Sequence, residues 1–309
     1  MIRYDLCVAW NWEYDAEFVM LLDVACRSYG LCLLQITPDN FEDLVERIFN
    51  HEITFRAFLD RASDTDERFV SIAQWANSHT VYCINPYEQA SRTWDKATMH
   101  SAFINAGLHV PSTIILPSYE EQPVLPPLDL SPLGDSFTIK PSQGSGGEGV
   151  IKEATSMDQV LIARQEYPTD KYLLQAYVVP VQLGSRPAWF RILYCAERLF
   201  PCWWDTDSYI FTPLISSEEI RYNLHSLHNI TVSIARLCEL DLFSTEIALT
   251  SDDLFVVVDY VNDQIDLRLK SNAIDGVPDD IVHNIVERLA SVVKAQHSRP
   301  PPWSGDTSS

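Results

Sequence analysis

Strand and helix patterns alternate through the first ninety residues, and this alternation constrains the fold more than any other feature of the chain. Runs of apolar residues predict strands at 5–10, 31–36, 53–59 and 80–84. Amphipathic spacing predicts the intervening helices at 15–29, 41–50 and 64–77. Because short connections through helices place successive strands parallel, we expect an open, Rossmann-like α/β domain over residues 1–92.

The rest of the chain changes character and predicts a mixed α+β region. A helix is expected over 93–106, ending at Gly107, and a Pro-rich surface loop over 117–134. Strands follow at 136–140 and 172–179, and then a tight turn at Ala196-Glu197 joins two antiparallel strands. Further elements are a long helix over 217–239, a strand pair around the turn at 251–253, a last helix over 279–295 and a disordered tail over 296–309.

The charge balance excludes several classes of partner. Asp and Glu number 43 against 22 Lys and Arg, which gives a formal net charge of −21. Nucleic acids and anionic membranes both require clustered cations, so neither is an expected partner. Seven scattered cysteines without a C-x-x-C pair, and the lack of an apolar run approaching ~20 residues, favour a cytoplasmic protein with reduced thiols.

A glycine-rich segment follows a predicted strand that ends in a lysine. Lys140 precedes four glycines within the six residues Gly144–Gly149. Such glycines let backbone N–H groups approach a phosphate closely, although an ordinary glycine-rich hairpin would give the same pattern. The lysine directly upstream favours a nucleotide site.

Two acidic side chains and an amide occupy adjacent predicted strands near the C-terminus. Glu246 lies in FSTEIAL, and Asp259 and Asn262 lie in VVVDYVND. Oxygen ligands of this kind suit Mg²⁺, which takes its remaining ligands from water and phosphate. An exposed edge strand would explain any one of these residues, but it explains the three together less well.

These features occur in the order of the ATP-grasp superfamily, which the sequence resembles up to about residue 295. The resemblance implies a pre-ATP-grasp domain at 1–92, an N-subdomain with the glycine loop at 93–171 and a C-subdomain with the metal site at 172–295. The motifs that carry it include the segment DKATMHSAFINAGLHVP, the Lys140 loop, Gln175-Ala176-Tyr177-Val178 and the acidic trio.

The resemblance also implies roles for individual residues. Lys96 and Lys140 would contact phosphates, and the loop with Ser145, Gly146, Gly147 and Gly149 would close over them. The backbone of Gln175, Ala176, Tyr177 and Val178 would bind the adenine edge, with Gln182 at the position of a ribose contact. Arg191 would contact phosphate or substrate.

Metal and acceptor positions complete the implied site. Glu246, Asp259 and Asn262 match the metal ligands, but the spacing between Asp259 and Asn262 is one residue longer than usual for the superfamily. Either a β-bulge restores the geometry, or Asp263 takes the last ligand position. Arg268 and Lys270 are candidates for binding an acidic acceptor, since arginine can bind a carboxylate bidentately. A solvated strand end would account for these two residues equally well.

The implied activity is ATP-dependent ligation of a carboxylate to an amine or a thiol through an acylphosphate. The implied cofactors are ATP and one or two Mg²⁺ ions, for which Mn²⁺ is a substitute, and the partners are small-molecule substrates. A homodimer is compatible with the resemblance. The alternatives are a small-molecule kinase on the same fold and a non-catalytic nucleotide-binding protein.

Overall fold

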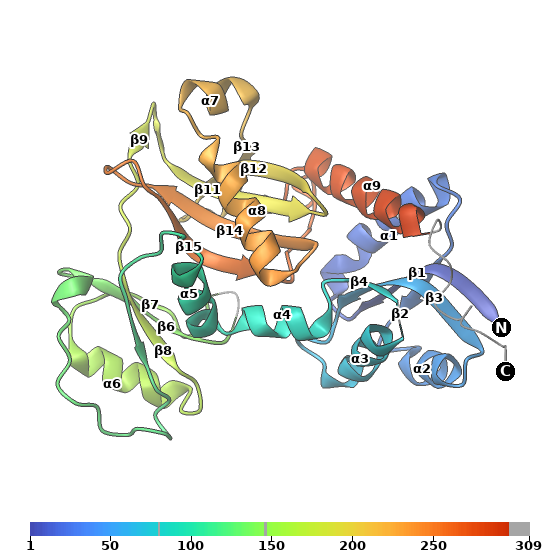
Figure 1. Cartoon of the computed structure of the whole chain (residues 1–309), viewed down its shortest axis with the longest axis horizontal. Coiled ribbons are helices and arrows are strands. Elements are labelled where there is room, and N and C mark those ends of the chain that lie inside the picture. The colour runs from blue at the N-terminus through green and yellow to red at the C-terminus, as the bar shows by residue number, and fades with distance from the viewer. Residues whose placement is uncertain (80, 145–146, 297–309) are drawn as a thin grey trace.

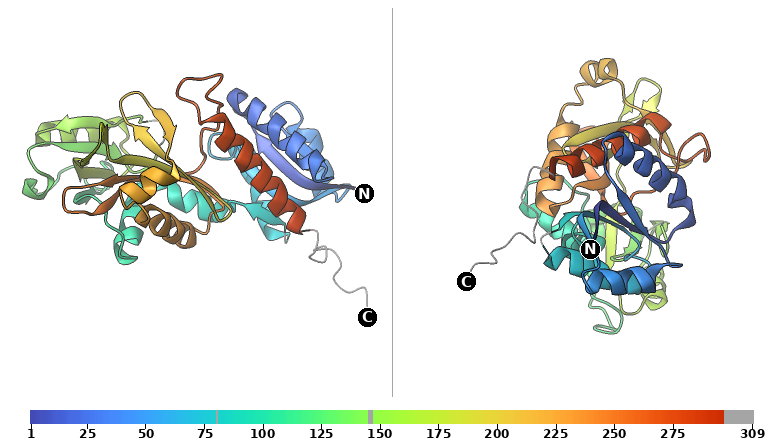
Figure 2. Two further views of the ribbon diagram at one scale, coloured as in Figure 1. Left: turned by 90° about the horizontal axis from the view of Figure 1, so that it is seen from above. Right: turned by 90° about the vertical axis from the view of Figure 1, so that its right-hand side faces the viewer.

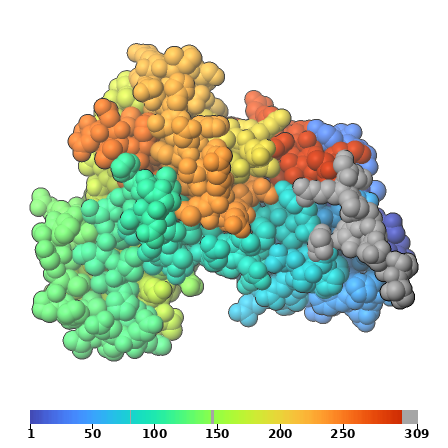
Figure 3. Space-filling model, viewed as in Figure 1, coloured from blue at the N-terminus to red at the C-terminus, as the bar shows by residue number. Residues whose placement is uncertain are grey.

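The computed structural model describes residues 1–79, 81–144 and 147–296. This part of the chain contains a four-stranded parallel sheet, a second four-stranded sheet, a five-stranded sheet and a two-stranded ribbon. The three larger sheets follow one another along an elongated molecule (Figure 1). On the lower side of the space-filling view, a notch separates the lobe of the first sheet from the lobe of the second (Figure 3).

The first sheet has the strand order β2-β1-β3-β4, and all its pairings are parallel. Its strands are β1 (Ile2–Trp10), β2 (Leu33–Ile36), β3 (Ile53–Arg61) and β4 (Tyr82–Ile84). Its helices are α1 (Ala16–Ser28), α2 (Phe41–Phe49) and α3 (Val70–Ser78). Alternate residues of β1 point to opposite faces: Leu6 and Val8 pack with α1, whereas Cys7 and Ala9 pack with α2 and α3. The predicted strand–helix alternation is therefore confirmed, with Thr80 of the fourth predicted strand outside the described residues.

The second sheet has the order β5-β8-β6-β7, and its strands pair antiparallel. The elements of this region are α4 (Tyr87–Trp94), α5 (Lys96–Asn105), β5 (Thr113–Leu116), β6 (Phe137–Pro141), β7 (Ile151–Ala154), α6 (Met157–Glu166) and β8 (Tyr172–Ala176). The helix expected over 93–106 is confirmed as α5, but it begins later, at Lys96, because Asp95 leaves the helical conformation and its carboxylate accepts hydrogen bonds from Ala97 N and Thr98 N. A side-chain cap thus starts a new helix at Lys96.

The Pro-rich segment 117–134 packs against the outer side of this sheet. Arg164 of α6 is fully buried, and its Nη2 donates to the carbonyl oxygens of Pro117, Ser118 and Gln122 at 2.8–2.9 Å. Leu125 then packs on the core formed by α6 and the sheet. The predicted loop is therefore a surface segment held by one arginine.

The third sheet has the order β13-β12-β11-β14-β15 and is antiparallel throughout. Its elements and those next to it are β9 (Gln182–Leu183), β10 (Arg186–Pro187), β11 (Trp189–Cys195), β12 (Arg198–Asp205), β13 (Ile210–Pro213), α7 (Ser216–Arg221), α8 (Ser226–Cys238), β14 (Leu242–Leu249) and β15 (Phe255–Asn262). The predicted turn at Ala196-Glu197 is confirmed, with φ of 43° and 72°. The long helix expected over 217–239 is wrong: Asn223 adopts a φ of 54°, which ends α7 and starts a separate helix.

The last helix returns to the first sheet. Helix α9 (Asp279–Ala295) lies alongside α1 (Figure 2), and Leu289 and Val293 share a buried core with Phe18 and Leu22. Arg61, at the end of β3, holds the connection from β15 to α9. Its Nη2 donates to the carbonyl oxygen of Ile265 at 2.9 Å. The end of β15 therefore lies against the first sheet.

Candidate active site

A cleft of about 610 Å³ separates the strands of the second sheet from β14 and β15 of the third. This volume falls in the range of about 300–1,000 Å³ typical of small-molecule sites. One wall is formed by β6, β7, the end of β8 and the glycine loop. The opposite wall is the strand edge from Val258 to Gln264, together with Glu246. Asp64 and Thr65, which follow β3 of the first sheet, close one end.

Two lysines lie on the side of the second sheet. Lys140 of β6 is 8% exposed; its Nζ lies 5.3 Å from the centre of the Tyr260 ring and 3.5 Å from the carbonyl oxygen of Val258. Lys96 lies at the start of α5, and its Nζ donates to the carbonyl oxygen of Gly144. Burial lowers the pKa of the Lys140 ammonium to about 8; Asp259 opposes this shift, and Lys96 adds to it. Two cations thus lie next to the root of the glycine loop.

The glycine loop continues from Lys140 along the same wall. Gly144 and Gly147 line the cleft with φ of 105° and 80°, whereas Ser145 and Gly146 lie outside the described residues. Gly149 is not among the residues lining this cleft; with a φ of 67° it packs beneath the Tyr167 ring. The positive φ values give these positions a backbone that glycine adopts without strain.

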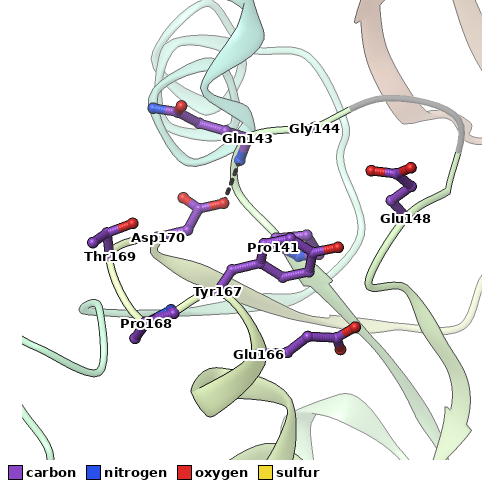
Figure 4. A pocket seen from close by; sticks show the side chains of 9 residues that line it. All are labelled: Pro141, Gln143, Gly144, Glu148, Glu166, Tyr167, Pro168, Thr169 and Asp170. Carbon is purple, nitrogen blue, oxygen red and sulfur yellow. Dashed lines mark hydrogen bonds between the residues drawn. The ribbon is translucent and has the colours of Figure 1, made fainter.

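A second hollow of about 450 Å³ lies on the outer side of the loop root (Figure 4). There the carboxylate of Asp170 accepts a hydrogen bond from Gln143 N at 2.9 Å, and the Tyr167 ring lies beside Pro141 (Figure 4). The turn that contains Tyr167 and Asp170 therefore supports the loop from behind.

The predicted acidic trio converges on the opposite wall. Glu246 of β14 pairs directly with Asp259 of β15, and Asn262 pairs with Ser244, so β15 contains one extra residue between these pairs. This is the β-bulge considered from the spacing. Asn262 Nδ2 donates to Asp259 Oδ2 at 2.9 Å, whereas the Asp263 carboxylate accepts from Asn85 Nδ2 at 2.6 Å. The bulge therefore brings Asn262, rather than Asp263, beside Asp259.

The two buried carboxylates of the trio influence each other's charge. Burial raises the pKa of Glu246, and the nearby Asp259 adds to the rise against the effect of Arg191. Burial also acts to raise the pKa of Asp259, but Lys140 and Lys96 outweigh it and hold that pKa below its usual range. A divalent cation between the carboxylates would stabilise both anions.

The residues of the trio fit a Mg²⁺ site in which water and the phosphates of a bound nucleotide supply the remaining coordination positions. Within residues 1–79, 81–144 and 147–296, no group of three His, Cys, Asp or Glu side chains is arranged to hold a metal by itself. Two carboxylates and an amide oxygen leave coordination positions for water and for phosphate oxygens, as is usual for Mg²⁺ in nucleotide sites.

The predicted hinge lies at the end of β8, where Gln175, Ala176, Tyr177 and Val178 all line the cleft. The side chain of Gln175 is buried and donates to the Tyr260 hydroxyl at 3.0 Å. Gln182, expected near a ribose, lies exposed on the β9–β10 ribbon and is not among the cleft residues.

Three further predicted residues lie away from the cleft surface. Arg191 is behind it: its Nη1 lies 3.5 Å from Glu246 Oε1, and its guanidinium lies 4.8 Å from the centre of the Trp204 ring. The expected acceptor-binding role of Arg268 and Lys270 is not supported by their positions. Arg268 is paired with Asp266 and Asp275, and Lys270 Nζ donates to a backbone carbonyl.

Several cleft residues gave no recognised signal in the sequence. Asp64 and Thr65 were missed, although residues that follow the carboxyl end of a parallel strand are frequent ligand contacts. Lys152 of β7, Tyr260 of β15 and Asp207 in the β12–β13 turn also line the cleft. Nothing in their local sequence distinguishes them from ordinary strand and turn residues.

Comparison with solved structures identifies the fold. No protein-family model and no curated protein sequence matches the chain. The ATP-grasp ligase PsnB, complexed with minimal precursor, Mg and ADP, superposes with a TM-score of 0.64 at 14% identity over 97% of this chain and 100% of its own. D-cycloserine synthetase DcsG gives a TM-score of 0.59 at 17% identity over 93% and 99%.

D-alanine–D-alanine ligase from Bacillus anthracis, complexed with ATP, gives a TM-score of 0.63 at 11% identity over 96% of this chain and 100% of its own. These similarities extend over nearly the whole of each molecule. The chain therefore has the ATP-grasp fold, as its sequence resemblance predicted. Within the described residues, no helix is long and apolar enough to cross a membrane.

Proposed function

We propose that this protein is an ATP-dependent ligase that joins a carboxylate to an amine, or to a thiol, through an acylphosphate. The observation that carries the proposal is the position of Lys140 opposite the Glu246–Asp259 pair across one cleft of about 610 Å³. Cations on one wall and oxygen ligands on the other suit a triphosphate bridged by metal. The solved structures that share this fold include several ligases, one of them complexed with Mg and ADP.

The nucleotide would lie along the wall of the second sheet. The backbone at 175–178 would bind the adenine edge, Lys96 and Lys140 would contact the phosphates, and the glycine loop would exclude water. Residues 1–92 would then be the Rossmann-like pre-ATP-grasp domain, with 93–171 and 172–295 the two subdomains that hold ATP. Arg191 would act indirectly, by holding Glu246 in place.

Glu246, Asp259 and Asn262 would hold Mg²⁺, which when bound neutralises charge on the transferred phosphoryl group. Lys140 would stabilise the same charge from the other wall; its pKa of about 8 in the free protein would rise on contact with phosphate. Charge-assisted contacts of this type contribute about 1.5–3 kcal/mol each.

The charge of the cleft favours an amine as the acceptor. Among the described residues that line it, the positive side chains are Lys96, Lys140 and Lys152, all on the nucleotide wall. Asp64 and Asp263 line the part next to the first sheet. The nearby guanidinium of Arg61 is already bound to Asp15, with Nε–Oδ2 and Nη2–Oδ1 distances of 2.8 and 2.6 Å. Burial raises the pKa of Asp64, and that of Asp263 to about 7, while Arg61 opposes both shifts. An ammonium would stabilise the anionic form of both carboxylates, whereas an acidic acceptor would not.

The test is phosphate release from Mg-ATP with a panel of carboxylates and amines. A ligase releases inorganic phosphate only when both acceptors are present, and we expect basic amines to be the better nucleophiles. A stable phosphorylated product from one acceptor would establish the kinase alternative instead. ATP binding without ADP formation across the whole panel would indicate a non-catalytic nucleotide-binding protein.

Variants connect this activity to the site. We expect Lys140→Ala and Asp259→Ala to abolish turnover while the far-UV circular dichroism and unfolding temperature remain close to those of the wild type. Lys294→Ala, an exposed position in the last turn of α9, is the matched control and should leave turnover unchanged. Retained turnover in either site variant would place the reaction elsewhere.

A further inference from the structure

Tyr260 joins three separate elements beside the lysine wall of the cleft. Its side chain is buried, with 1% of its surface exposed. Its hydroxyl lies 2.6 Å from His100 Nδ1 of α5 and 3.0 Å from Gln175 Nε2 of β8. Since Tyr260 belongs to β15, these two contacts connect the third sheet to the second sheet and to α5.

The hydrogen-bond directions follow from the chemistry of the three groups. The Gln175 amide nitrogen has only protons to offer, so it donates to the Tyr260 oxygen. When His100 is neutral with its proton on Nε2, the hydroxyl donates its proton to His100 Nδ1. Burial, together with the nearby Lys140, lowers the pKa of His100 and favours this neutral ring. The Tyr260 hydroxyl therefore has partners on both α5 and β8.

The ring of Tyr260 supports the Lys140 ammonium. Lys140 Nζ lies 5.3 Å from the ring centre, within the range of a cation–π contact. Its hydrogen bond to the Val258 carbonyl oxygen is 3.5 Å long and therefore weak. The residue that precedes Tyr260 is Asp259, so the same stretch of β15 holds both the lysine support and a proposed metal ligand.

We propose that Tyr260, held by His100 and Gln175, is the positioning residue that fixes the Lys140 ammonium and the spacing between the phosphate-binding and metal-binding strands. The inference rests on the proposed nucleotide site and assigns it a supporting network. Loss of the hydroxyl removes both hydrogen bonds but leaves the ring. The main consequence is a less well-placed ammonium, which weakens contacts with the phosphates of a ligand more than the contacts of the 175–178 backbone with its adenine.

The experiment compares ADP with adenosine as ligands of the full chain in EDTA, by calorimetry. We expect Tyr260→Phe to weaken ADP binding about tenfold and adenosine binding much less, because Gln175 stays paired within the sheet. Tyr172→Phe is the matched control, because Tyr172 is also a fully buried tyrosine, on β8, and its hydroxyl donates to the Ala163 carbonyl oxygen at 2.6 Å away from the cleft. Equal effects of the two variants on ADP, or equal loss of ADP and adenosine, would overturn the proposal.

If Tyr260→Phe does not fold, substitutions at His100 test the same hydrogen-bond network. In His100→Asn the side-chain oxygen can take the place of Nδ1 as acceptor, whereas His100→Leu has no acceptor. We expect ADP affinity close to wild type in the asparagine variant and a loss similar to that of Tyr260→Phe in the leucine variant. The same ADP affinity in both would refute the network. Failure of the wild type to bind either ligand would instead count against the proposed function.

Discussion

The pKa of Lys140 predicts that the proposed nucleotide binding depends on pH. Burial lowers the pKa of this ammonium to about 8 in the free protein, and a bound phosphate would raise it. The cation that contacts phosphate is therefore present below pH 8 and is lost as the pH rises through that value. If only the protonated form binds, the apparent Kd is proportional to one plus the ratio of neutral to charged lysine. That ratio rises from about 0.1 at pH 7 to about 10 at pH 9, so the apparent Kd rises roughly tenfold.

Calorimetric titration with ADP in EDTA measures this effect without contributions from a metal. The phosphates of the nucleotide are already ionised over the range, since their second pKa is about 6. Lys140→Arg is the control, because a guanidinium stays charged throughout. We expect a tenfold decline for the wild type and a flat profile for the arginine variant. A flat wild-type profile, or the same decline in Lys140→Arg, would refute the assignment of Lys140 to the phosphates.

Two substitutions test how the structure supports the cleft. In Gly149→Ala, the new methyl group would lie 2.6 Å from Cε2 of Tyr167, at a φ of 67°. We expect the free energy of unfolding in urea to fall by about 1–2 kcal/mol, and Tyr167→Ala to restore part of it. Additive effects in the double variant would contradict this expectation. Asp15→Asn leaves the buried Arg61 without its anion and should cost about 3–5 kcal/mol. The control is Asp23→Asn, which removes the ion pair between Asp23 and the exposed Arg27. We expect this variant to lower the free energy of unfolding by less than about 1 kcal/mol. Equal losses in the two variants would refute the contribution of burial.

The parts of the fold that follow local rules could be predicted from the sequence. Apolar runs separated by amphipathic helices gave the parallel sheet, and two neighbouring strand patterns gave the pairing of Glu246 with Asp259. The extra residue before Asn262 was interpreted as either a β-bulge or a sign that Asp263 is the ligand. A bulge was a possible interpretation because strand side chains alternate, and one inserted residue is the smallest change that restores the alternation. These predictions needed only nearest-neighbour geometry.

The features that the sequence did not predict depend on how the chain folds beyond its local strand and helix patterns. Arg268 looked available for a substrate, but Asp266 and Asp275 neutralise it, and only the folded connection to α9 brings all three together. Gln182 had the right place in the order of motifs, but the short β9–β10 ribbon carries it away from the cleft. Asp64 reaches the cleft because the first sheet lies against the end of β15, which no local pattern encodes.

The arrangement would allow a chain with a net charge of −21 to bind the triphosphate proposed above. Without a metal, Glu246 and Asp259 repel the phosphates across the cleft and partly cancel Lys140 and Lys96. A divalent cation between the carboxylates reverses the sign of that wall, so the metal strengthens nucleotide binding, and by linkage the nucleotide must strengthen metal binding by the same factor. Among the described residues, no third His, Cys, Asp or Glu side chain joins the two carboxylates of the proposed metal site. The metal would therefore lack ligands without the nucleotide phosphates, and the phosphates would lack a counter-charge without the metal. Mg²⁺ and nucleotide are therefore expected to bind as one unit.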